Sequence, residues 1–253
     1  MASDSKNTVY VVTGGNRGLG LGLSKALLTR PNNTVIATVR NEQKATELKQ
    51  ETASVATGSG STLHIVQLDF STAVAPEKIL EAFKNGIDHI DVLINNAGFA
   101  QPMVPASETT AEDLRTAFEV NTIAPLLVFQ GLKPLLQKVS SPKLIMVSSS
   151  VGSIAEMESF PGGAYGPSRA AQNWLTKALH QENNKDMGLI SIALHPGWVQ
   201  TRAGQFVADQ WGFTEGPPDT IESSVEGMLK VIDEATQDTS GKFMTQKGQI
   251  LGW

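Results

Sequence analysis

The sequence predicts a single α/β domain with one doubly wound parallel sheet of about seven strands and helices on both faces. Three observations favour this fold. Short β-branched or apolar runs alternate with helical patterns along the whole chain. The strand runs are mostly apolar and lack a period of two, as expected when helices cover both faces of a sheet. The 253 residues contain no linker, internal repeat or low-complexity tract, and this length suits one α/β domain.

Each predicted strand is a short apolar run between turn residues. The strands are expected at residues 8–13, 34–39, 63–68, 91–95, 143–149, 189–194 and 242–245. Helical periodicity fills most of the gaps between them. The helices are expected at residues 21–29, 41–53, 76–85, 111–139, 167–183 and 221–235. Pro125 and Pro134 predict kinks or a break in the longest helix. Residues 201–220 are predicted to form an irregular lid loop, because long loops in compact domains usually cover binding sites.

A glycine-rich turn lies between the first strand and the first helix. Gly14, Gly18 and Gly20 belong to the pattern Thr-Gly-x-x-x-Gly-x-Gly. Glycines here allow φ > 0, let a phosphate approach the backbone and leave N–H groups free at the helix N-terminus. The turn therefore predicts a dinucleotide site, although its spacing differs from the G-x-G-x-x-G fingerprint.

Tyr165 and Arg169 lie four residues apart, so a helix would place the phenol and the guanidinium side by side. A tyrosine has an ordinary pKa near 10 and exchanges protons at neutral pH only when a neighbouring cation stabilises the phenolate. A surface Tyr beside a solvated Arg is the alternative on general grounds. The surrounding motifs favour a proton-transfer pair.

Composition argues against several classes of function. The net charge of -5 and the pI near 5.4 leave no basic surface for nucleic acid. The chain has no cysteine, and His64, His89, His180 and His195 lack the spacing of metal ligands. The polar residues 1–7 and the absence of a long apolar run predict a soluble, cytoplasmic protein without signal peptide or membrane span.

Further motifs occur in the order found in the short-chain dehydrogenase/reductase family, which the chain resembles over nearly its whole length. Asn-Asn-Ala-Gly at residues 95–98 follows the fourth strand, and Pro-Gly-Trp-Val-Gln-Thr at residues 196–201 follows the sixth. The ending at residues 241–253 resembles the carbonyl-reductase branch with norsolorinic-acid-ketoreductase-like and C-factor-like members. The resemblance implies a Rossmann fold, a nicotinamide cofactor and reduction of a carbonyl substrate.

The resemblance also implies catalytic roles. Tyr165 would donate a proton to the substrate carbonyl, Ser149 would polarise that carbonyl, and Asn121 would organise a water relay. Ser148 and Ser150 are alternatives to Ser149, which matches the family best by its distance along the chain from the following glycine.

Arg169 stands where the family has a lysine that binds the cofactor ribose. A guanidinium keeps the positive charge and can donate to ribose hydroxyls. It stays protonated at any working pH and is bulkier than an ammonium, so we expect slowed catalysis.

The cofactor is expected to contact residues of the glycine turn, the strand ends and the active site. These are Gly14, Asn16, Arg17, Gly18, Leu19, Gly20, Arg40, Asp69, Phe70, Asn95, Ala97, Gly98, Tyr165, Arg169, Pro196, Gly197, Val199 and Thr201. An acidic residue after the second strand would accept from a ribose 2'-hydroxyl, but this site holds Arg40, with Arg17 in the turn. Two guanidiniums favour the 2'-phosphate of NADPH.

The predicted function is NADPH-dependent reduction of a ketone or aldehyde. Trp198, Phe206, Trp211 and Phe213 around the lid favour an aromatic or polyketide-like substrate, with simple lid packing as the alternative. Three other functions stay open: a cofactor-retaining isomerase or cyclase, a weakly active NADPH-binding regulatory protein, and a Lys-to-Arg variant of an active reductase. The family resemblance also implies a homodimer or homotetramer through the helices at 111–139 and 167–183, with a monomer as the alternative.

Overall fold

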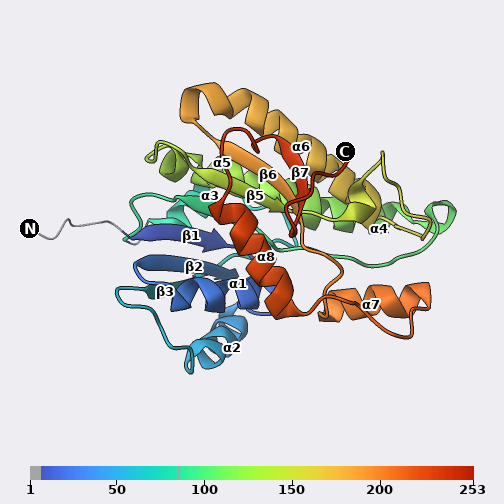
Figure 1. The fold of residues 1–253 in the computed structure, drawn as a ribbon, viewed down its shortest axis with the longest axis horizontal. Coiled ribbons are helices and arrows are strands. Elements are labelled where there is room, and N and C mark those ends of the chain that lie inside the picture. The colour runs from blue at the N-terminus through green and yellow to red at the C-terminus, as the bar shows by residue number, and fades with distance from the viewer. Residues whose placement is uncertain (1–6, 85) are drawn as a thin grey trace, which may run out of the picture.

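One parallel sheet forms the centre of the computed structural model, which describes residues 7–84 and 86–253 (Figure 1). Its strands are β1 (Thr8–Val12), β2 (Asn33–Val39), β3 (Thr62–Gln67), β4 (Val92–Asn95), β5 (Lys143–Val147), β6 (Ile190–His195) and β7 (Lys242–Thr245). The strand order is β3-β2-β1-β4-β5-β6-β7, and every pair is parallel. The order reverses between β1 and β4, where such sheets bind ligands beyond their carboxyl ends. The predicted doubly wound sheet is confirmed.

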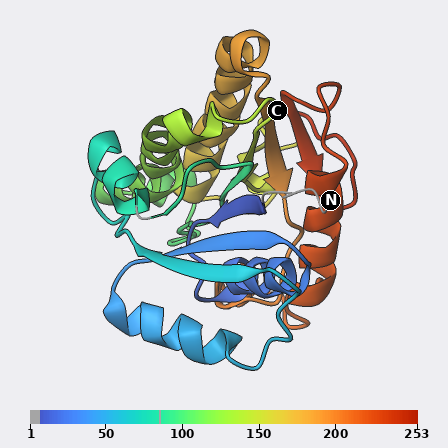
Figure 2. The same cartoon turned by 90° about the vertical axis from the view of Figure 1, so that its left-hand side faces the viewer.

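Helices cover both faces of this sheet (Figure 2). They are α1 (Gly18–Thr29), α2 (Glu42–Thr52), α3 (Pro76–Phe83), α4 (Ala111–Phe118), α5 (Ala124–Leu136), α6 (Tyr165–Met187), α7 (Arg202–Trp211) and α8 (Ile221–Asp233). On one face, α1 and α8 pack into a core that contains Leu27 and Leu229. On the other, α3, α5 and α6 pack around Phe83 and Phe129. No helix in the described part of the chain has the length and apolar composition to cross a bilayer.

Several helix ends differ from the prediction. α1 starts at Gly18 because the glycine turn itself supplies the first turn of helix. α6 starts at Tyr165, before the predicted start at Pro167, so this proline lies in the first turn of the helix. A proline is tolerated there because its missing N–H would have no partner in any case. α3 ends at Phe83, and its predicted end at residue 85 lies outside the described residues.

The predicted long helix at residues 111–139 is divided in three. α4 passes into a π-helical segment, Glu119–Ile123, before α5 begins. Pro125 lies in the first turn of α5, where its missing N–H is tolerated. Pro134 lies inside α5 and does not end it. The break therefore takes the form of a π-helical turn, which carries Asn121.

The predicted lid loop at residues 201–220 contains a helix, so the expectation of an irregular segment was wrong. The Thr201 hydroxyl accepts from the Gly204 N–H at 3.0 Å and caps the N-terminus of α7. Gly212, at φ 71°, ends the helix in the left-handed conformation. Val207 and Ala208 are buried, so α7 packs on the body of the domain.

Candidate active site

A cavity of about 1060 Å³ opens at the carboxyl ends of the strands. Every residue predicted to contact the cofactor lines it except Asn95, and the predicted catalytic residues Ser149, Tyr165 and Arg169 line it as well. The fold thus brings the glycine turn, the ends of β4 to β6 and the start of α6 to one site.

The glycine turn has the geometry of an anion-binding site. Gly14 and Gly18 have φ values of 67° and 52°, which favour glycine. A Cβ on Gly20 would overlap the carbonyl of Gly14, so the turn admits no side chain there. The residue before α1, Arg17, provides no side-chain cap, which leaves the first N–H groups of the helix for a ligand.

Thr13 joins the glycine turn to the loop after β4. Its hydroxyl accepts from the backbone N–H groups of Asn96 and Ala97 at 2.9 and 3.0 Å. The Asn96 amide donates back to the Thr13 carbonyl at 2.9 Å. One buried hydroxyl therefore fixes the two loops on either side of the point where the strand order reverses. Thr13 and Asn96 are thus site residues beyond those predicted from the sequence.

Two predicted site residues lie outside the cavity lining. Asn95 ends β4 with its side chain turned into the fold, where it donates to the Pro125 carbonyl at 3.2 Å. Successive residues of a strand point to opposite faces, so its neighbour Asn96 lines the cavity instead. The amide of Asn121 exchanges hydrogen bonds of 2.8 and 2.7 Å with the backbone of Phe99 and donates to the Ser168 hydroxyl at 2.9 Å. Its side chain therefore holds the β4 loop against α6.

The three serines after β5 differ in what their hydroxyl groups do. All three line the cavity. The Ser148 hydroxyl donates to the Asn173 amide oxygen at 2.6 Å, and the Ser150 hydroxyl donates to the Glu158 carboxylate at 2.5 Å. The Ser149 oxygen accepts a backbone N–H at 3.3 Å. Of these three serines, Ser149 is thus the one whose hydroxyl proton has no acceptor among the described residues.

Tyr165 and Arg169 lie side by side, as their spacing predicts. The guanidinium carbon is 5.1 Å from the centroid of the Tyr165 ring, which it overlies. Arg169 is 4% exposed, whereas Tyr165 is only partly buried. The pair is positioned by the first turn of α6 and by the glycines that pack on it, Gly98 and Gly152.

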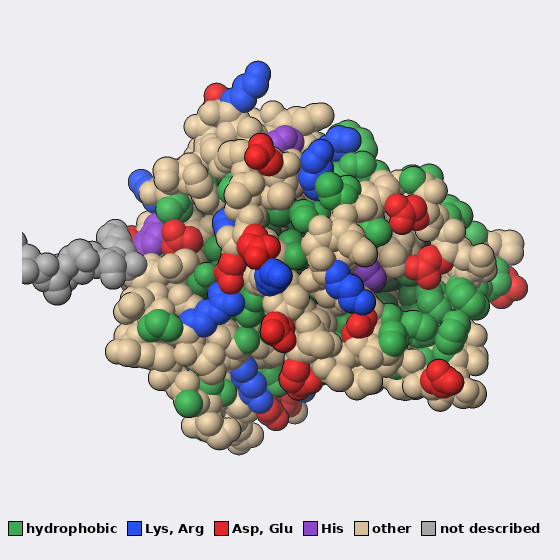
Figure 3. Space-filling model, in the orientation of Figure 1, with side chains coloured by type: hydrophobic (Ala, Val, Ile, Leu, Met, Phe, Trp, Pro, Cys, Tyr) green, Lys and Arg blue, Asp and Glu red, His purple; other side chains and the backbone are tan. Residues whose placement is uncertain are grey.

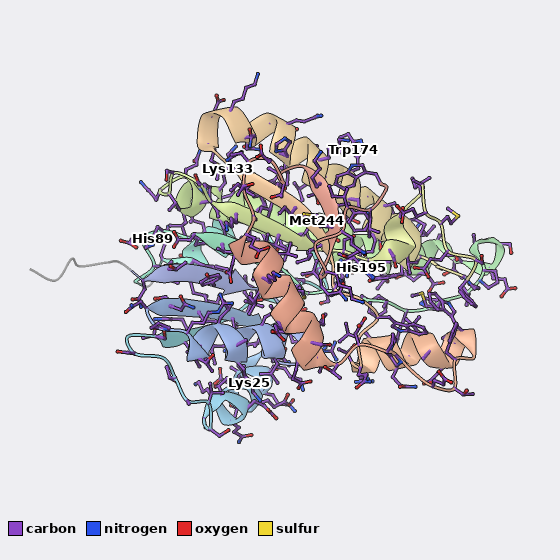
Figure 4. The ribbon with its side chains drawn as sticks, in the orientation of Figure 1. Lys25, His89, Lys133, Trp174, His195 and Met244 are labelled. Carbon is purple, nitrogen blue, oxygen red and sulfur yellow. The ribbon has the colours of Figure 1, made fainter. Side chains whose placement is uncertain are left out.

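His195 lies at the carboxyl end of β6 (Figure 4), beside the turn formed by Ser148, Ser149 and Ser150. Its Nδ1 accepts from the Ser150 N–H at 3.2 Å, which places the ring proton on Nε2. Burial lowers the pKa of His195 to about 4, although the Asp219 carboxylate opposes the shift. At neutral pH an uncharged imidazole therefore holds the turn that presents the Ser149 hydroxyl.

Cations line the part of the cavity beside the glycine turn and the ends of β2 and β3. Arg17 and Arg40 lie there as predicted, and Lys44 in the first turn of α2 adds a third positive charge. The exposed Asp69 lines the same part and accepts the N–H of Ser71 at 2.9 Å.

Aromatic side chains join the lid to the loop before Tyr165. Trp211 stacks on Phe160 with ring centroids 5.0 Å apart, and Trp198 meets Phe213 edge-on at 5.0 Å. The Trp211 indole donates to the Pro161 carbonyl at 3.0 Å. Hydrophobic side chains accordingly gather near α7 (Figure 3). Trp198 and Trp211 line the cavity, while Phe213 packs behind them and Phe206 does not line it.

Comparison with known proteins assigns the family. A family model described as short chain dehydrogenase matches residues 8–211. The chain belongs to this family. It is 41% identical to a short-chain dehydrogenase of Pyricularia oryzae, covering 98% of this chain and 100% of that protein. It is 38% identical to a norsolorinic acid ketoreductase of Emericella nidulans, covering 99% and 95%. The predicted oxidoreductase family, with its carbonyl-reductase branch, is confirmed.

Solved structures agree with this assignment. The NADPH-bound carbonyl reductase from chicken fatty liver superposes with a TM-score of 0.81 at 32% identity, covering 98% of this chain and 100% of that one. The carbonyl reductase Sniffer of D. melanogaster gives a TM-score of 0.83 at 27% identity, with coverage of 98% and 100%.

Proposed function

We propose that the protein is an NADPH-dependent ketoreductase that reduces a ketone or aldehyde to an alcohol. The observation that carries the proposal is the common cavity, which Ser149, Tyr165 and Arg169 line together with the glycine turn. A carbonyl compound beside these residues would meet a hydroxyl donor, a phenol and a fixed cation. This set of groups serves proton transfer to an oxygen that gains negative charge.

The residues that surround the cavity fit NADPH. The open first turn of α1 suits a pyrophosphate, and no side chain obstructs the approach at Gly20. Arg17, Arg40 and Lys44 supply the charge that a 2'-phosphate needs. When bound, NADPH supplies the hydride that adds to the substrate carbonyl carbon.

Two side chains act on the substrate oxygen in this proposal. The Ser149 hydroxyl donates a hydrogen bond to the carbonyl oxygen, since its proton has no acceptor within the described protein. Tyr165 gives its phenolic proton to the same oxygen, which completes the alcohol. Arg169 holds its positive charge over the ring and stabilises the phenolate that remains. The relay role of Asn121 stays a prediction, and its bonds to Phe99 and Ser168 support a role in positioning.

The aromatic side chains that line the cavity near α7 favour a bulky, aromatic or polyketide-like substrate. Trp198 and Trp211 offer two indole surfaces at the cavity, against which a flat ring system can stack. Relatives named norsolorinic acid ketoreductases favour the same class of substrate.

We also propose self-association through α4, α5 and α6, the helices that occupy residues 111–139 and 167–183. Trp174 projects from α6 with 70% of its surface exposed (Figure 4), which is unusual for so large an apolar side chain. Sedimentation of the wild type should give a dimer or tetramer, and Trp174→Glu should give a monomer. A wild-type monomer would reject this part of the proposal.

Oxidation of NADPH, followed by its absorbance with a panel of aromatic ketones, tests the activity. Tyr165→Phe should abolish turnover, and Arg169→Lys should raise it at least about tenfold, since an ammonium is smaller and can pass on a proton. Tyr10→Phe is the matched control, because Tyr10 is the other tyrosine and lies in the core. If both the wild type and Arg169→Lys bind NADPH but neither reduces a ketone, the protein would instead be a weakly active NADPH-binding protein.

The cofactor is tested separately by calorimetry. Arg40→Asp should weaken the binding of NADPH much more than that of NADH, because it replaces a phosphate partner with a like charge. Arg115→Asp is the control, since Arg115 is an exposed arginine away from the cavity lining. Equal losses for both cofactors in Arg40→Asp would contradict the assignment to the 2'-phosphate.

A further inference from the structure

The guanidinium of Arg169 is turned partly into the fold. Its Nη1 donates to the Val147 carbonyl at 2.9 Å and to the Gln172 side-chain oxygen at 2.7 Å. Its Nε is buried and has no hydrogen-bond partner within the described residues. Nη1 and Nε therefore both lie inside the fold. The two hydrogen bonds of Nη1 determine how the guanidinium is oriented.

Gln172 is the side chain that orients it. This residue lies three positions further along α6 and has no exposed surface. Its oxygen accepts from Arg169, while its amide nitrogen reaches only the sulfur of Met146, at 3.8 Å. A buried amide oxygen is costly without a donor, so the glutamine and the arginine depend on each other.

The remaining nitrogen, Nη2, lies against the cavity wall. It packs on Gly98, where an added Cβ would overlap it, and both residues line the cavity. It makes no hydrogen bond to the described residues, and it is not among the fully buried unpartnered atoms, so it faces the open space. Because a guanidinium is a rigid plane, fixing Nη1 also fixes the direction of Nη2.

We propose that Gln172 is a positioning residue, which holds Nη1 of Arg169 inside the fold so that Nη2 points into the cavity where the cofactor would bind. This inference rests on the proposed function, since it takes NADPH as the occupant of the cavity. Gln172 touches neither cofactor nor substrate and acts only through the arginine.

The test compares two substitutions that differ in the acceptor. Gln172→Met keeps the length of the side chain and removes the oxygen, whereas Gln172→Glu keeps an oxygen in its place. Gln172→Met should weaken NADPH binding about tenfold in calorimetry and lower kcat by a similar factor, with the KM for the ketone unchanged. Gln172→Glu should keep both values within about threefold of wild type.

Thr176→Val is the matched control for the loss of a buried polar group. Thr176 lies one turn further along α6, is equally buried, and donates only to the backbone carbonyl of Gln172. Its substitution should lower the melting temperature without changing the affinity for NADPH. Circular dichroism of all variants checks that the fold is retained.

A double-mutant cycle separates positioning from general packing. If Gln172 acts through the guanidinium, Gln172→Met should have less than about a twofold effect on NADPH affinity once Arg169→Met has removed that group. An equal loss in both backgrounds, or wild-type affinity in the single variant, would overturn the positioning role alone. A wild-type protein that does not bind NADPH would instead overturn the proposed function, and the positioning role with it.

Discussion

The uncharged imidazole of His195 should make the cofactor-free protein lose stability in mild acid. The pKa of His195 is about 4 in the fold, against 6.5 ordinarily, so between these values the unfolded chain binds a proton that the folded chain does not. The stabilisation is therefore complete above pH 6.5 and is lost as the pH falls towards 4. The whole difference corresponds to at most about 3 kcal/mol, of which about 2 kcal/mol lies between pH 7 and pH 5.

Urea unfolding at these two pH values measures the effect. His195→Gln removes the titrating group and keeps an acceptor for the Ser150 N–H. The free energy of unfolding of the wild type should fall by about 2 kcal/mol more than that of His195→Gln between pH 7 and pH 5. His64→Gln, which replaces an exposed histidine, should behave like wild type. If wild type and His195→Gln lose equal stability, the folded imidazole titrates normally, contrary to the prediction.

Three further substitutions test the site. Ser149→Ala should lower kcat by on the order of a hundredfold, whereas Ser148→Ala should mainly lower the melting temperature; kinetics and thermal unfolding distinguish them, and the reverse pattern would reassign the catalytic serine. Gly98→Ala should displace the Arg169 guanidinium and weaken NADPH binding at least about tenfold in calorimetry; unchanged affinity would contradict this. Trp211→Phe keeps the ring stack but loses the indole hydrogen bond, so the KM for an aromatic ketone should rise several-fold with unchanged NADPH affinity, and a constant KM would contradict the role of the lid.

The sheet and the glycine turn could be predicted because local sequence determines them. Each strand is an apolar run that two layers of helices bury, and each lies within about two residues of its predicted ends. The left-handed conformations of Gly14 and Gly18 follow from the lack of a Cβ. The spacing of Tyr165 and Arg169 was sufficient to place them side by side once a helix was assumed.

Contacts between distant segments could not be predicted in this way. Asn95 and Asn96 are the same amino acid, and only the pleat at the end of β4 decides which one lines the cavity. Arg169 and Gln172 are only three residues apart, but the inward direction of the guanidinium also depends on its bond to the Val147 carbonyl at the end of β5. α7 was missed because aromatic residues, glycines and prolines in its region resemble a loop, although Thr201 is a good N-cap.

The glycines that pack on Arg169 also restrict the order in which the sequence can change. A Cβ on Gly98 would overlap Nη2, and one on Gly152 would lie 2.6 Å from the Cβ of Arg169. A shorter residue at position 169 would make room at position 98, but not at position 152, where the backbone of α6 itself is in the way. A change at position 98 with Arg169 present therefore displaces the guanidinium from its observed place, whereas the same change after position 169 has shortened displaces nothing.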